Sequence, residues 1–74
     1  MANTLVPGRY RHFKGNEYEV YGVARHAEND EQLVVYRPLY GAGELWVRPL
    51  AMFTEQVERD GETMQRFTLV AAAD

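Results

Sequence analysis

The sequence contains no cysteine and no serine. Without cysteine the chain has no disulfide, no thiolate nucleophile and no thiolate metal ligand, and this absence suits a reducing cytoplasm. Without serine there is no serine-based acyl transfer, so the only aliphatic hydroxyls belong to four threonines. No apolar run approaches the ~20 residues of a membrane span, and the first residues lack the charged and apolar regions of a signal peptide. We therefore expect a cytoplasmic protein with no membrane segment and no cofactor.

Lysine is nearly absent as well. Seven of the eight basic residues are arginine, and the net charge is −3. A net acidic domain lacks the broad positive field that drives non-specific nucleic-acid binding, so general DNA binding is not expected. Arginine binds carboxylate or phosphate through two planar hydrogen bonds and stacks on aromatic rings. The composition leaves room for a local arginine pocket.

Histidine is scarce too, because His12 and His26 are the only two. They do not have the paired spacing of a zinc site, so no metal is predicted. Either could serve as a general base, which keeps a small histidine-dependent hydrolase as a second alternative function, although spacing identifies no companion groups. A simpler interpretation pairs His12 across strands with Glu19.

The length and the aromatic content point to one small domain. A chain of 74 residues can build only one core, and nine aromatic residues give that core large apolar area. We expect the domain to span residues 8–70, with a flexible arm over residues 1–7 and a frayed tail over residues 71–74.

Short segments rich in tyrosine and valine, separated by glycine turns, predict an all-β fold. Gly22 interrupts the second segment, which indicates a bulge or a sharp bend. The first choice is a small antiparallel barrel of the SH3-like type, or a rolled sheet of the same kind. The first four predicted strands cover residues 9–13, 17–27, 32–39 and 44–48.

The last third of the chain allows two interpretations. In the preferred one, residues 49–53 form a single helical or 3-10 turn, and residues 55–59 and 63–70 form a hairpin around a type I′ turn at Asp60-Gly61. In the alternative, a helix covers residues 49–60 and Gly61 caps it. Acidic side chains along this hairpin are interpreted as a solvated edge that discourages pairing with other chains.

Hairpin loops with even numbers of residues would set the register of the sheet. Arg9 then faces Gly22, Gly22 faces Arg37, and Arg37 faces Trp46, while a bulge at Gly22 or an odd-membered loop would move half of the residues to the other face. This row resembles a pocket for a small anion with a flat ring, such as a nucleotide. The simpler interpretation is a cation–π contact of Arg37 on Trp46. The candidate ligand-binding residues are Arg9, His26, Arg37, Tyr40, Trp46 and Arg48, and no catalytic residue is assigned.

The tyrosines suggest a different use of the same region. An aromatic groove could bind a proline-rich peptide, and a free sheet edge could bind another protein. The alternative function is therefore a protein-interaction adaptor, with the oligomeric state left open. The groove residues would be Tyr18, Tyr21, Tyr36, Tyr40 and Trp46.

A family resemblance is carried by four segments, GRYRHFKGNEYEVYGVARH, LVVYRPLYG, LWVRPLAMF and DGETMQRF. Together they resemble the small bacterial family called domain of unknown function 1653, over residues 8–70. The resemblance implies a short, stand-alone bacterial protein, and the family supplies no catalytic residues to transfer. Its pattern has proline before the Arg66-Phe67 pair where this chain has Gln65, which puts the shape of the last turn in question. The sequence as a whole predicts an uncharacterised, non-enzymatic binding module.

Overall fold

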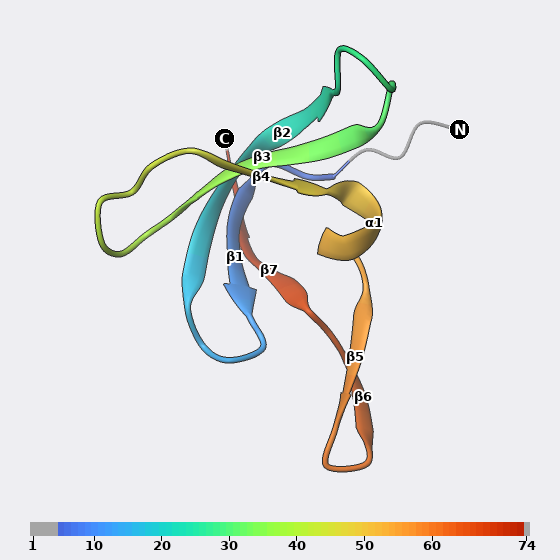
Figure 1. The fold of residues 1–74 in the computed structure, drawn as a ribbon. Helices are drawn as coiled ribbons and strands as arrows, with labels where there is room; N and C mark the ends of the chain where they lie inside the picture. The colour runs from blue at the N-terminus through green and yellow to red at the C-terminus, as the bar shows by residue number, and fades with distance from the viewer. Residues whose placement is uncertain (1–4, 74) are drawn as a thin grey trace.

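The computed structural model describes residues 5–73. Five strands form one antiparallel sheet in the order β4-β3-β2-β1-β7, and β5 and β6 form a separate hairpin that extends away from it (Figure 1). The elements are β1 (Gly8–His12), β2 (Glu17–Arg25), β3 (Gln32–Pro38), β4 (Trp46–Pro49), α1 (Leu50–Phe53), β5 (Gln56–Arg59), β6 (Glu62–Gln65) and β7 (Phe67–Ala72).

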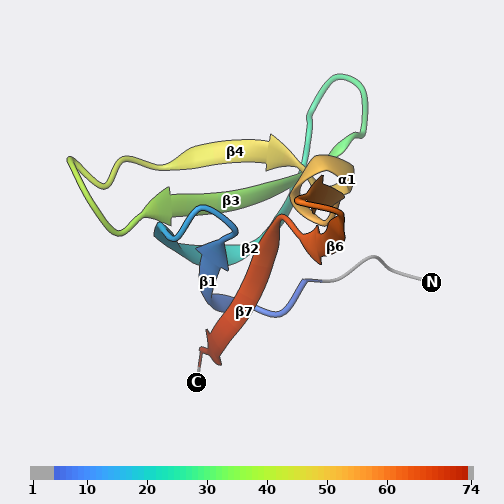
Figure 2. The ribbon, with the colours of Figure 1, turned by 90° about the horizontal axis from the view of Figure 1, so that it is seen from below.

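The five-stranded sheet is rolled but remains open. Its outer strands, β4 and β7, each have one neighbour in the sheet and are not paired with each other (Figure 2). The predicted all-β fold with a rolled antiparallel sheet and one helical turn is thus confirmed, whereas the sheet does not close into a barrel. No helix within residues 5–73 is long and apolar enough to cross a membrane.

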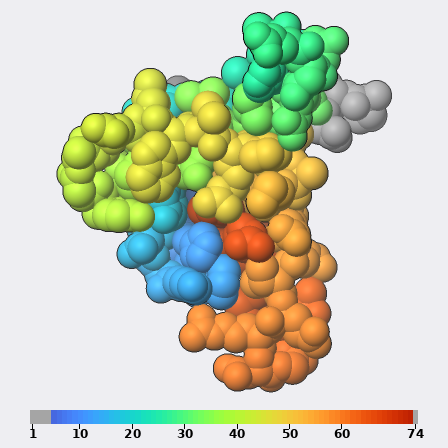
Figure 3. All heavy atoms as spheres, in the orientation of Figure 1, coloured from blue at the N-terminus to red at the C-terminus, as the bar shows by residue number. Residues whose placement is uncertain are grey.

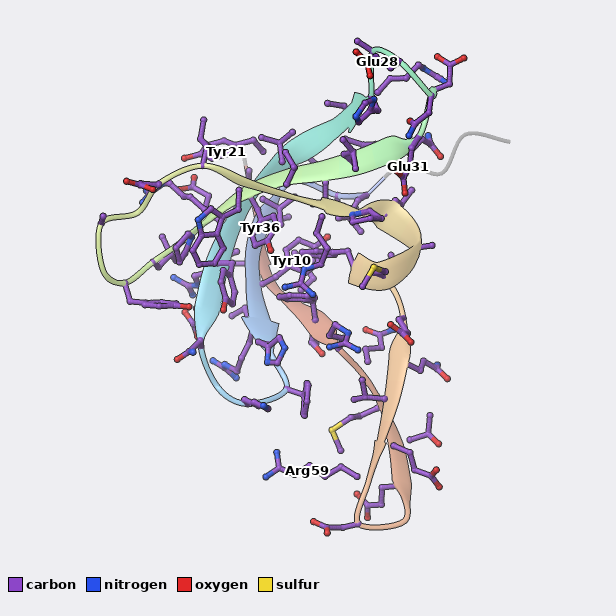
Figure 4. All side chains as sticks on the ribbon, in the orientation of Figure 1. Tyr10, Tyr21, Glu28, Glu31, Tyr36 and Arg59 are labelled. Carbon is purple, nitrogen blue, oxygen red and sulfur yellow. The ribbon has the colours of Figure 1, made fainter. Side chains whose placement is uncertain are left out.

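Aromatic rings fill the concave side of the roll, as the composition predicts. Tyr36 and Tyr10 lie at the centre (Figure 4), and Phe53 from α1 stacks on Phe67 with 4.0 Å between ring centroids. Pro49, whose missing N–H costs nothing at the start of a helix, directs the chain from β4 into α1 and so brings Phe53 over the sheet. The buried hydrophobic residues are Tyr10, Tyr18, Val20, Val34, Tyr36, Leu50, Phe53 and Phe67.

The preferred interpretation of the last third is confirmed. Asp60 and Gly61 connect β5 to β6 and both have positive φ, at 55° and 79°, as a type I′ turn requires. The alternative helix over residues 49–60 is wrong, because α1 ends at Phe53. The single strand predicted over residues 63–70 is divided at Arg66, so that β6 pairs with β5 and β7 pairs with β1.

The tail is paired where the sequence predicted fraying. Ala71 and Ala72 lie opposite Arg9 and Gly8, and the N–H of Ala73 donates to the carbonyl of Pro7 at 2.9 Å. The backbone makes all of the hydrogen bonds of this pairing. Alanine side chains therefore gave the sequence no signal for it. In the predicted arm, Leu5 packs against the core. Residues 1–4 of the arm and the last residue of the tail, Asp74, lie outside the described residues.

Gly8 allows the two ends of the chain to meet. Its φ is 151°, and a Cβ placed there would meet the carbonyl oxygen of Ala71 and the Cα of Ala72, the latter at 2.9 Å. We expect Gly8→Ala to lower the free energy of unfolding by about 1–3 kcal/mol, measured by urea denaturation. Gly22→Ala is the matched control, because Gly22 has a similar φ of 156° and open space around its Cα. Equal losses in the two variants would show that the close approach contributes nothing.

Candidate functional site

The register of the sheet differs from the predicted one. Arg9 lies opposite Glu19, Glu19 opposite Arg37, and Tyr36 opposite Trp46. Residues 12–16 separate the last pair of β1 and β2, and residues 37–45 separate the last pair of β3 and β4. Both connections are odd-membered, so the row of Arg9, Gly22, Arg37 and Trp46 is not formed.

A bulge in β2 adds to this change. Val20 lies opposite Tyr36 and Gly22 opposite Val35, so Tyr21 is the additional residue. Gly22 therefore follows an irregularity of the kind that its presence in a strand predicted. Val20 is buried and Tyr21 is exposed on the outer face, the side of the sheet turned away from the core.

Arg9 and Arg37, two of the predicted ligand residues, lie on this outer face. Arg9 is 3.4 Å from Glu17. Arg37 contacts Glu19 at 3.0 Å and donates from Nε to the hydroxyl of Tyr21 at 2.6 Å. These exposed pairs occupy both guanidinium groups, and the predicted stacking of Arg37 on Trp46 is replaced by the bond to Tyr21.

His26 also lies away from the other predicted residues. Its Nδ1 accepts a hydrogen bond from the N–H of Glu28 at 3.1 Å, and its own N–H donates to the carbonyl of Glu31 at 2.7 Å. Figure 4 shows Glu28 and Glu31 in the loop between β2 and β3, far from Tyr36 at the centre. The role of His26 in the structure is to close this turn.

The other three predicted residues, Tyr40, Trp46 and Arg48, gather on the concave side of the sheet. Trp46 lies 6.1 Å from Tyr36 and 6.4 Å from Tyr18 between ring centroids. Tyr40 lies 5.8 Å from Tyr18, and their hydroxyls are 3.1 Å apart. Four of the five residues predicted to form an aromatic groove therefore meet here, and Tyr21 is the exception. We call this group the concave site: His12, Tyr18, Tyr36, Tyr40, Trp46 and Arg48.

Arg48 supplies the charge of the concave site. It is half-buried, its Nε donates to the hydroxyl of Tyr36 at 3.1 Å, and its guanidinium carbon lies 5.6 Å from the centre of the Phe67 ring. The ion pairs within residues 5–73 are formed by Arg9, Arg11, Arg37 and Arg66. Arg48 therefore has no carboxylate partner in this part of the chain.

His12 also belongs to the concave site, although the sequence indicated it only as a possible general base or as a cross-strand partner of Glu19. Its ring lies 5.0 Å from that of Phe67, its partner in β7, so the predicted pair with Glu19 is wrong. Burial lowers the pKa of His12, and the positive charges of Arg66, Arg48 and Lys14 lower it further. The positive charges of Arg66, Arg48 and Lys14 thus act together on His12, although the protein has a net negative charge.

Arg66 brings an unsatisfied donor to the same region. Its Nη2 lies 3.3 Å from a carboxylate oxygen of Glu55, while its buried Nε has no hydrogen-bond partner within residues 5–73. Figure 3 shows orange-red atoms, the colour of the chain from β6 to β7, beside the blue atoms of the turn that joins β1 to β2 and below the yellow atoms of β4. A buried donor without a partner is uncommon in native structures and is satisfied by water, an ion or a ligand.

The surface next to Trp46 is hollowed. A cavity of about 190 Å³ is lined by Pro38, by residues 40–44 and by Trp46. It is smaller than the ~300 Å³ at which small-molecule pockets begin, so a ligand there would be only partly enclosed. A larger cavity of about 490 Å³ lies between Leu5 and α1, and no cationic side chain lines it.

The fold and the site together define a small all-β domain with an open, rolled sheet whose concave side carries Arg48 among aromatic rings. The family model described as "Protein of unknown function (DUF1653)" matches residues 8–69, and the chain belongs to this family. A crystal structure of a DUF1653 protein from Bordetella bronchiseptica is 36% identical, covers 95% of this chain and 92% of its own, and superposes with a TM-score of 0.84. Among curated proteins, none matches this chain. The family resemblance stated from the sequence is thereby confirmed.

Proposed function

We propose that this protein is a non-enzymatic binding module that takes a small anion bearing a flat ring, of the nucleotide type, in the concave site. The single observation that carries the proposal is Arg48, a half-buried guanidinium without a carboxylate partner in residues 5–73. A guanidinium has five N–H donors, and the bond to Tyr36 uses one of them. The remaining donors suit the planar, two-bonded recognition of phosphate or carboxylate.

The surroundings of Arg48 favour an anion over a neutral ligand. The unsatisfied Nε of Arg66 needs an acceptor. The positive charges of Arg66, Arg48 and Lys14, which lower the pKa of His12, would attract an anion to the same place. In a partly desolvated site such charges interact more strongly with an anion than they would in water.

The aromatic rings of the concave site favour a ligand with a flat ring. Trp46 is 42% exposed and Tyr40 is exposed beside it, so each offers a ring face or edge to a bound molecule. Stacking of a base on an aromatic side chain contributes about 1–3 kcal/mol. Arg48 would thus contact the anionic end, and Trp46 or Tyr40 the ring.

The adaptor alternative is favoured by a different observation. Exposed apolar side chains surround the loop between β3 and β4, where a peptide could lie across the aromatic rings. They are Leu39, Tyr40, Leu45, Trp46 and Val47. We rank the anionic ligand above a peptide because Arg48 carries a positive charge without a carboxylate partner in residues 5–73.

The proposal is tested by the fluorescence of Trp46, the only tryptophan. Iodide should quench it, because the indole is exposed, and AMP or GMP should both shift the emission and protect it from iodide. Ribose 5-phosphate and inorganic phosphate should bind more weakly than the nucleotides, since they lack the ring. An indole that is indifferent to every nucleotide and phosphate would contradict the proposal.

Arg48→Gln should weaken nucleotide binding by about tenfold or more, because it removes hydrogen bonds to a charged group. The matched control is Arg37→Gln, which also removes an arginine bonded to a tyrosine hydroxyl, but on the outer face. Thermal unfolding should first show that both variants are folded. Their nucleotide binding constants are then measured from the fluorescence of Trp46 and compared. Equal weakening by the two substitutions would remove Arg48 from the site.

A further inference from the structure

The two edges of the sheet differ in regularity. The pairing of β7 with β1 shifts register between Arg9 and Tyr10, whereas the pairing of β4 with β3 runs without interruption from Leu33 to Tyr36. Bulges distort a strand and are one of the features by which proteins discourage pairing at a sheet edge. β4, at the border of the sheet in Figure 2, therefore presents a regular free edge.

The side chains along this edge are unusually exposed for apolar residues. Leu45 is 65% exposed and Val47 is 59% exposed, the two highest values among the large exposed hydrophobic residues in the described part of the chain. They stand on either side of Trp46, and Val47 lies opposite Val35, on the outer face. Covering such residues is favourable in proportion to the apolar area removed from water.

The geometry of antiparallel pairing limits how β4 could pair with another β4. Opposed residues in an antiparallel pair are both hydrogen-bonded or both not, and the two kinds alternate along each strand. Two identical strands related by a two-fold axis therefore meet with one residue opposite itself. If that residue is Trp46, then Leu45 lies opposite the second copy's Val47, and Glu44 opposite its Arg48.

This arrangement is complementary in charge as well as in shape. Acidic and basic residues at an edge ordinarily oppose pairing, but here each exposed Glu44 meets an arginine. Arg48 has no carboxylate partner within residues 5–73, and it retains N–H donors beyond the one that bonds Tyr36. Centring the axis on Val47 would instead place Glu44 beyond Pro49, opposite the second copy's Leu50.

We propose that two copies of this chain associate edge to edge through antiparallel pairing of β4 about Trp46, which joins their two five-stranded sheets into one. Pairing extends β4 backwards by two residues to include Glu44 and Leu45. The partner is a second copy because the segment from Glu44 to Arg48 matches its own reverse: opposite charges at the ends, apolar residues next to them and an aromatic residue at the centre. This inference shares Arg48 with the proposed function, because the second copy's Glu44 and the anionic ligand would both bind that guanidinium. The contacts of Leu45 and Val47 do not depend on the ligand, because they lie on the outer face.

A contact of one short strand covers less than the ~1,200 Å² at which standard protein interfaces begin. The association is therefore expected to be weak and reversible. Sedimentation velocity of the full chain over a wide range of concentrations should show a shift from monomer towards dimer as concentration rises. A chain that remains monomeric at millimolar concentration would overturn the proposal.

Val47→Lys tests the edge itself. The substitution adds a charge to an exposed residue at the centre of the contact and should shift the dissociation constant at least tenfold towards monomer. Leu69→Lys is the matched control, because Leu69 is an exposed apolar residue on β7, the other edge. Loss of the dimer in Leu69→Lys, with a normal dimer in Val47→Lys, would overturn the assignment to β4.

Exchange of the two charges tests the register. Glu44→Arg should weaken the dimer, since two arginines then face each other twice, and adding Arg48→Glu to the same chain should restore it. A folded double variant that stays monomeric would overturn the pairing about Trp46. Because Arg48 also bonds Tyr36, circular dichroism must first show that the double variant folds; if it does not, Glu44→Gln should weaken the dimer less than Glu44→Arg, and equal effects would overturn this register.

Discussion

Phe67→Ala should cost a large part of the stability of this protein. Phe67 is buried, stacks on Phe53 at 4.0 Å and touches the edge of the Tyr18 ring at 5.6 Å between centroids. Truncation of a buried phenylalanine costs about 3–5 kcal/mol, through lost transfer free energy and the cavity that remains. A chain of this length has an expected stability of about 4–11 kcal/mol. Urea denaturation should therefore show a free energy of unfolding lower by about 3–5 kcal/mol, which would unfold the variant at 25 °C if the stability of the unchanged protein lies at the lower end of its expected range.

Two controls separate the ring stack from general loss of apolar area. Met52→Ala removes an exposed side chain from α1 and should change the free energy of unfolding by less than about 1 kcal/mol. Phe67→Leu keeps most of the volume and should fold, but it removes the flat face beneath Arg48. If Phe67→Ala proved as stable as Met52→Ala, the aromatic core described here would be incorrect.

The sequence was informative where one local signal determines the structure. Asp60-Gly61 needs two positive φ angles, and the chain forms the predicted hairpin around it. Pro49 precedes a single helical turn, as predicted, and Thr54 follows the last residue of that turn, with its N–H and its hydroxyl both bonded to the carbonyl of Leu50. In each case a few adjacent residues are enough to predict the local structure.

The candidate site could be predicted only in part, because the face on which each side chain lies depends on whether each loop has an odd or an even number of residues. One residue more or less in a loop moves every following side chain to the other face of the sheet. The connection after β1 holds an odd number of residues because the N–H of His12 bonds the carbonyl of Asn16, a contact that no residue type in the turn specifies. As a result Arg9 and Arg37 lie outside, while Trp46 and Arg48 lie inside.

Phe67 and His12 were missed for a related reason. They belong to β7 and β1, strands far apart in sequence whose pairing no hairpin predicts. The available signal was the Arg66-Phe67 pair itself, a charged residue followed by a large aromatic one at the place where the last strand divides. The division leaves β6 paired with β5, while β7, which begins at Phe67, pairs with β1 (Figure 1).

Stability should fall steeply at high pH, and Tyr18 should account for much of the fall. Burial, followed by the hydrogen bond to Tyr40, raises the pKa of Tyr18 from 10.0 to about 12. Below pH 10 the hydroxyl is protonated in both the folded and the unfolded chain. Between pH 10 and about 12 the unfolded chain releases a proton that the folded chain keeps, so stability is lost as pH rises. Across this window the free energy of unfolding falls by about 2–3 kcal/mol, because the folded chain binds one proton more than the unfolded chain.

Tyr18→Phe should flatten this dependence, because the variant has no hydroxyl to ionise. Its stability at pH 7 should fall by about 1 kcal/mol, through loss of the bond to Tyr40. Some slope should remain, since burial also raises the pKa of Tyr10. Tyr21→Phe is the control, because it removes the same hydroxyl from an exposed side chain and should leave the steep slope in place. Urea denaturation at intervals from pH 8 to pH 11.5 measures the unchanged protein and both variants. An unchanged slope in Tyr18→Phe would contradict the burial of this hydroxyl in the concave site.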